Sequence, residues 1–113
     1  MYASANYIGC NFYSSGAGNQ GPLSTNTWYQ IVQTYNYTTK LISIYTNGTL
    51  SSTGTSGTDL NANAAVAQAM VGNGFWGGDG WQGSIPVVRV YNKELSQAEI
   101  NQNYNALAYR YNL

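Results

Sequence analysis

The stretch from residue 81 to residue 110 constrains the fold more than any other part of this 113-residue chain. Residues 83–91 (GSIPVVRVY) are rich in β-branched and aromatic side chains, which predicts a strand. Pro86 cannot donate a backbone hydrogen bond to a neighbouring strand, so we expect this strand at a sheet edge or with a bulge. Ser96 and Glu99 then match the capping-box pattern that begins a helix. One apolar stripe of that helix is expected to face the protein, and it comprises Ile100, Tyr104, Leu107 and Tyr111.

The rest of the chain predicts strands joined by polar turns. Alternating or consecutive β-formers predict strands over residues 6–13, 27–36, 41–46 and 66–71. Stretches rich in Gly, Ser, Thr and Asn predict loops over 14–22, 51–65 and 72–80. Asn47-Gly48 follows the 41–46 run and predicts a tight hairpin, because a type I′ turn needs positive φ at both central residues. We therefore expect an all-β, antiparallel β-sandwich with one short C-terminal helix, forming a single domain over residues 1–113.

Charge and cysteine content exclude several classes of function. The chain has four Lys and Arg, four Asp and Glu, no His and one Cys. Without a basic patch, nucleic acid is not an expected partner. Cys10 alone can form no intrachain disulfide, and we expect it to be a buried small apolar residue. Residues 1–39 hold no long apolar run, so we expect neither a signal peptide nor insertion into a membrane.

Three segments resemble the laminin-G-like jelly roll of the concanavalin A-like lectin and glucanase superfamily. They are WYQIV with Thr34-Tyr35, KLISIYTNGTL over residues 40–50, and Phe75 to Tyr104, where an aromatic residue, a Gly and an Ile lead into VRVYNKELSQAEINQNY. The resemblance covers residues 27–108 and implies a jelly-roll β-sandwich. Members of the family usually have further strands before the one that matches residues 6–13. This implies that the chain either is the later part of a larger domain or has its sheet completed by a strand from a partner.

Catalysis is not expected. Without His, a Ser-His-Asp triad and a His-ligated zinc site are both impossible. Two carboxylates could still hydrolyse a glycosidic bond. The resemblance implies that such an enzyme would carry a Glu, an Asp and a Glu close together on one strand. Here Asp59 and Asp79 fall in separate predicted loops, and Glu99 is expected to cap the helix, so a glycoside hydrolase is the weakest of the functional alternatives.

The Gly-rich loop over 72–80 is the expected ligand site. Trp76 could stack on a sugar ring while Asn73 and Asp79 hydrogen-bond its hydroxyl groups, with Tyr13 as a neighbour. The alternative, equally weighted, is that Trp76 only closes one end of the sandwich. Asp59, Asp79 and loop carbonyls could instead bind Ca²⁺. Two acids far apart in sequence are weak support for calcium, and we predict no metal ligands and no cofactor.

The composition also suggests a biological setting. A nearly uncharged surface rich in Asn, Ser, Thr and Gly tolerates close packing in an assembly. The resemblance implies modules that occur in phage and viral structural proteins. We therefore expect a non-enzymatic structural or adhesion module of a virion, either a capsid decoration or a tail-associated protein, that is oligomeric or bound to other virion subunits. The alternative is an extracellular, lectin-like module, secreted or surface-bound, that binds cell-surface glycans.

Overall fold

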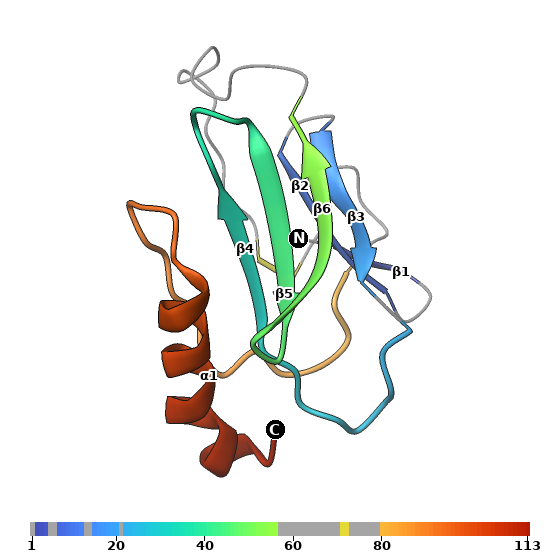
Figure 1. The fold of residues 1–113 in the computed structure, drawn as a ribbon. Coiled ribbons are helices and arrows are strands. Elements are labelled where there is room, and N and C mark those ends of the chain that lie inside the picture. The colour runs from blue at the N-terminus through green and yellow to red at the C-terminus, as the bar shows by residue number, and fades with distance from the viewer. Residues whose placement is uncertain (1, 5–6, 13–14, 21, 57–70, 73–79) are drawn as a thin grey trace.

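The computed structural model describes residues 2–4, 7–12, 15–20, 22–56, 71–72 and 80–113, with side chains from residue 22 onward. Its strands form two three-stranded antiparallel sheets, followed by one helix (Figure 1). The first sheet has the order β1 (Tyr2–Ser4), β2 (Tyr7–Phe12), β3 (Ser15–Gln20). The second has the order β4 (Ile31–Tyr35), β5 (Leu41–Thr46), β6 (Thr49–Thr55), and the helix is α1 (Gln97–Tyr111). The prediction of a mostly β protein with one C-terminal helix is confirmed.

The two sheets meet along one side of the second sheet. Strand β3 lies against β6, so the first sheet is on the β6 side, whereas α1 lies on the β4 side (Figure 1). This arrangement leaves β5 in the middle of the second sheet, with a hydrogen-bonded neighbour on each side. The centre of that sheet is therefore the place where side chains are removed from water most completely.

The described core is built on β5. Ile42 and Ile44 have no exposed surface, and alternate positions of a strand share one face. The register pairs Tyr35 with Ile42 and Gln33 with Ile44. Partly buried apolar side chains pack against the two isoleucines, and these are Leu23, Ile31, Tyr35 and Trp81. The Ile-x-Ile alternation of the 41–46 run is thus what places the core.

Helix α1 begins where the capping box predicts. Ser96 is extended, its Oγ accepts a hydrogen bond from the Glu99 amide at 3.3 Å, and the Glu99 carboxylate accepts one from the Ser96 amide at 2.9 Å. Ile100 is fully buried, and the other three residues of the predicted stripe are half-buried. At the other end of the helix, the rings of Tyr111 and Trp28 are 5.4 Å apart between centroids. None of the described helices is long and apolar enough to span a membrane.

Two predicted loops contain strands. Residues 15–20, expected to lie in a loop, form β3 and pair with β2 through Gly16 and Asn19, among others. Residues 51–55, also expected in a loop, continue β6 to Thr55. A sheet ladder is made by backbone groups, so a segment of Gly, Ala, Ser and Thr joins it when a neighbouring strand offers partners. Local propensity alone undervalues such segments.

Two predicted strands are shorter or absent. The expected strand over 27–36 begins only at Ile31, and Trp28 lies before it with 40% of its surface exposed. The strand expected over 83–91 is not formed: these residues pair with no other described strand. Their side chains favour a strand, but a strand also needs a neighbouring strand to form hydrogen bonds with. In addition, Pro86 has no backbone N–H to donate to such a neighbour. In the predicted 66–71 strand, only Val71 is described, and it lies in a bend.

Candidate functional site

The β5–β6 turn is one wall of the candidate site. Asn47 has φ 50° and Gly48 has φ 78°, the left-handed pair that a type I′ hairpin requires. The Asn47 side-chain oxygen accepts a hydrogen bond from the Gln30 amide at 2.9 Å, and the Asn47 amide donates to the Gln30 carbonyl at 2.9 Å. The predicted turn is confirmed, and it is fixed to the segment that leads into β4.

Helix α1 approaches this turn so closely that a side chain at Gly48 has little room. A Cβ added at Gly48 would lie 3.1 Å from Asn101 Oδ1 and 3.5 Å from the Tyr104 ring. Two features therefore favour glycine at this position, the positive φ and the short distance to the helix. The turn and the helix therefore pack directly against each other, although they are far apart in the sequence.

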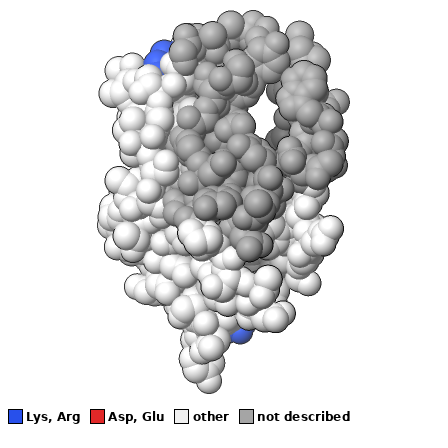
Figure 2. Space-filling model, turned by 90° about the vertical axis from the view of Figure 1, so that its right-hand side faces the viewer, with Lys and Arg blue, Asp and Glu red and all other residues white. Residues whose placement is uncertain are grey.

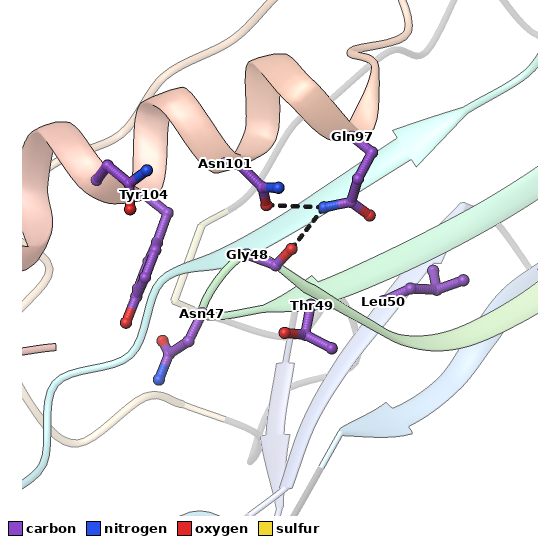
Figure 3. A pocket seen from close by; sticks show the side chains of 8 residues that line it. Asn47, Gly48, Thr49, Leu50, Gln97, Asn101 and Tyr104 are labelled. Carbon is purple, nitrogen blue, oxygen red and sulfur yellow. Dashed lines mark hydrogen bonds between the residues drawn. The ribbon is translucent and has the colours of Figure 1, made fainter.

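Gln97 joins the turn to the helix. Its Nε2 donates to the Gly48 carbonyl at 2.6 Å and to Asn101 Oδ1 at 2.8 Å (Figure 3). Both hydrogens of this amide are thus occupied, so its own oxygen is the group left to interact with a ligand. In the same way, the bonds to Asn47 and Asn101 oxygens leave their Nδ2 groups as donors.

An open groove of about 560 Å³ lies between the turn and the helix. Figure 3 shows amide and hydroxyl side chains from the two elements on either side of it, with the Tyr104 ring beside Asn47 and Gly48. The lining consists of Asn47, Gly48, Thr49, Leu50, Gln97, Asn101, Tyr104 and Asn105. None of these residues is an acid or a base at neutral pH. The groove therefore offers hydrogen-bond donors and acceptors, one aromatic ring and one aliphatic side chain, without net charge.

Two charged side chains near the start of α1 are paired with one another. Lys93 and Glu99 form an ion pair, and the Lys93 ammonium, followed by the Ser96 amide, lowers the pKa of Glu99 to about 2. A carboxylate in the first turn of a helix also interacts favourably with the helix dipole. Glu99 is thereby committed to holding the helix start. On the face shown in Figure 2, the described surface is almost entirely uncharged.

We expect the stability of the protein to fall at acid pH through Glu99. Because the folded-state pKa of about 2 lies below the ordinary value of 4.5, this contribution is fully present above pH 4.5 and is lost as pH falls towards 2. Thermal melts followed by circular dichroism across this window would measure it. A Glu99→Gln variant keeps the capping-box geometry without the charge. Its melting temperature should vary less over the same pH range, and an identical pH dependence would contradict the assignment.

The sequence-predicted ligand residues fall outside the described part of the chain. Asn73, Trp76 and Asp79, their suggested neighbour Tyr13, and the calcium candidate Asp59 are all in this position. The structure therefore neither brings these residues together nor separates them. Within the residues it does describe, no group of three or more His, Cys, Asp or Glu side chains could hold a metal ion.

Sequence reasoning missed the groove, although a signal for it was present. Gln97, Asn101 and Asn105 are spaced by four, so they share one face of a helix. An amide stripe of this kind is ordinary on a solvated helix. Only the packing of α1 onto the Asn47-Gly48 turn gives it a second wall.

Comparison with known proteins identifies the class. The sequence profile of a family described as the concanavalin A-like lectin/glucanases superfamily matches residues 2–101. The chain belongs to this superfamily. A search of curated protein sequences found no match.

A solved structure supports the same fold. An S-layer domain-containing protein from Clostridium thermocellum ATCC 27405 superimposes with a TM-score of 0.61 at 17% sequence identity. The alignment covers 79% of this chain and 43% of that one, so the chain matches less than half the length of its structural neighbour. At this level of identity the likeness concerns the fold alone.

Proposed function

We propose that the chain is a non-enzymatic, surface-exposed module whose two sheets belong to a jelly-roll β-sandwich and which binds an uncharged glycan. The observation that carries the proposal is the uncharged groove between the β5–β6 turn and α1. Sugar hydroxyls both donate and accept hydrogen bonds, and the groove presents amide nitrogens and amide oxygens within one short span. Tyr104 adds an aromatic ring, and Leu50 adds apolar surface, as is usual in sites for neutral ligands.

The groove holds no pair of groups that could perform hydrolysis. Its lining has no carboxylate, and Glu99 lies outside it in the ion pair with Lys93. Glycoside hydrolysis needs two carboxyl groups on either side of the bond to be cleaved. The proposal is therefore one of binding without catalysis. Incubation of the purified protein with β-glucans should release no reducing ends, and their release would overturn this part of the proposal.

The proposed binding should depend on the groove amides. Asn105 lines the groove and takes no part in the Gln97 bonds to Gly48 and Asn101, so Asn105→Ala should remove ligand contacts while leaving those bonds in place. Loss of a neutral hydrogen bond costs about 1 kcal/mol, which corresponds to roughly fivefold weaker binding. A glycan array would first identify a ligand, and titration calorimetry would then compare the affinities.

Gln102→Ala is the matched control, because Gln102 is an exposed amide on the same helix that does not line the groove. It should bind as the unaltered protein does. Because the groove offers no carboxylate for Ca²⁺, chelation by EDTA should also leave binding unchanged. An array without any bound glycan, or equal affinities for the Asn105 and Gln102 variants, would contradict the proposed site.

A virion component is the second candidate, supported by the uncharged composition. With four acids and four bases in 113 residues, copies of the chain repel one another only weakly. In that setting the protein would be a capsid decoration or tail-associated module in contact with other virion subunits. An extracellular or cell-surface location is the first candidate, in keeping with a glycan-binding role. Mass spectrometry of purified particles would separate the two, since only a virion component would co-purify with them.

A further inference from the structure

We propose that Trp28 forms a second sugar-binding position beyond the groove, so that the chain recognises a neutral oligosaccharide rather than a single sugar. The inference rests on the proposed glycan-binding function and extends it to the length of the ligand. It starts from the place of Trp28 in the fold: this residue precedes β4, and 40% of its surface is exposed. An indole ring left partly in water offers a large apolar surface for stacking.

The Trp28 ring is held in place by its neighbours. Its contact with the Tyr111 ring is tilted, with 5.4 Å between centroids and 56° between the ring planes. Tyr111 is also contacted by the Arg110 guanidinium, which lies 5.4 Å from its ring centre. The loop before Trp28 is fastened by the Ser24 amide, which donates to the Tyr29 hydroxyl at 3.0 Å. A ligand therefore meets an indole that is already oriented, and such pre-organisation lowers the cost of binding.

Trp28 and the groove lie along the same two elements. On the strand side, Gln30 exchanges hydrogen bonds with the groove residue Asn47, and Trp28 comes two residues before Gln30. On the helix side, Tyr104 lines the groove, and Tyr111 follows it on α1 after about two turns. Figure 1 shows the segment that leads into β4, the β5–β6 turn and the C-terminal end of α1 at the same end of the molecule. Trp28 therefore continues the line of the groove.

The spacing of the two aromatic positions determines the size of the ligand. Seven residues advance a helix by about 10 Å, which is longer than one pyranose ring. A single sugar beside Tyr104 therefore cannot reach the Trp28–Tyr111 pair, whereas linked sugars can. Ala108 lies on the helix face between Tyr104 and Tyr111, and its methyl group is too small to block the path. Leu107 follows the buried Ile100 by seven residues, so it lies on the core side of this path.

Trp28→Ala tests the inference in the full chain. The probes are glucose, mannose, galactose and N-acetylglucosamine, each offered as the monosaccharide and as a linear hexasaccharide, in titrations followed by NMR. At least one hexasaccharide should bind more tightly than its monosaccharide, and it alone should shift the indole N–H signal of Trp28. Trp28→Ala should weaken binding of that hexasaccharide about tenfold and leave any binding of the monosaccharide unchanged. Trp28→Phe keeps an aromatic ring and should retain most of the affinity.

Tyr109→Ala is the matched control, because Tyr109 is a fully exposed aromatic residue on α1 that does not line the groove. It should bind every probe as the unaltered protein does, and circular dichroism would confirm that the variants are folded. If Asn105→Ala weakens binding but Trp28→Ala has no effect, or has the same effect on both lengths, the second position is overturned and the groove stands. If no probe binds, or Asn105→Ala has no effect, the proposed glycan-binding function fails and this inference fails with it.

Discussion

An Ile44→Ala variant is expected to lose about 2–5 kcal/mol of its free energy of unfolding. Ile44 is fully buried at the centre of the second sheet, where β4 and β6 flank it and Trp81 is among the side chains packed on the core. Truncation removes three carbon atoms from this core, and the surrounding strands can close the resulting cavity only in part. Chemical denaturation followed by tryptophan fluorescence would measure the loss.

Leu41→Ala is the appropriate control, because Leu41 is on the same strand with 37% of its surface exposed. Its truncation should cost clearly less than that of Ile44, since less apolar surface leaves the protein interior. Similar losses for the two variants would show that the centre of β5 is not the core of the protein.

A Gly48→Val variant is expected to lose about 2 kcal/mol or more, because an L-residue in the left-handed region costs about 1–2 kcal/mol before any contact is counted. Contacts add to this cost. The new Cβ would lie 3.1 Å from Asn101 Oδ1, and the branched side chain would press against the Tyr104 ring. The helix must then move away from the turn, which weakens the bond from Gln97 to the Gly48 carbonyl. Loss of stability and loss of ligand binding should therefore appear together.

Gly80→Val separates this effect from a general intolerance of the chain to valine. A Cβ at Gly80 would meet no heavy atom within 4 Å, and its φ lies outside the positive range. We expect a change in unfolding free energy close to zero. If both glycine variants were equally stable, close packing of the turn against α1 could not be the reason for glycine at position 48.

The parts of the fold that sequence predicted are those determined by a few neighbouring residues. Ser96 and Glu99 satisfy each other's backbone groups within one helical turn, so their pattern predicts the start of α1 directly. Asn47-Gly48 likewise places the hairpin, because few other residue pairs adopt two successive left-handed conformations. The alternating run over residues 41–46 likewise predicts β5, on which Ile42 and Ile44 share one fully buried face. Ser43 between them is buried as well, so the opposite face of β5 is also covered there.

The parts that sequence did not predict depend on distant partners. Strand β3 contains small residues whose place in the sheet is set by the backbone of β2. Residues 83–91 have the opposite property, since they carry strand-forming side chains but find no partner within the described fold. For the candidate site, the amides of Gln97, Asn101 and Asn105 could be assigned to one helix face, but not to the face that meets the turn. That assignment needs the packing of two elements about fifty residues apart.

The bond between Gln97 and Gly48 has a consequence for the order in which the protein folds. This bond joins residues that are 49 positions apart. The Asn47-Gly48 turn, in contrast, forms from the pairing of β5 with β6, which are adjacent in the sequence. A hairpin forms within about 1–10 μs. Bringing Gln97 to Gly48 closes a much longer loop, and the chain loses conformational entropy in closing it before the bond can form. We therefore expect the turn to form first and to provide the surface on which α1 docks. In this order the groove is created only in the last step, so a nascent chain with a complete β5–β6 hairpin is expected to lack the proposed binding site.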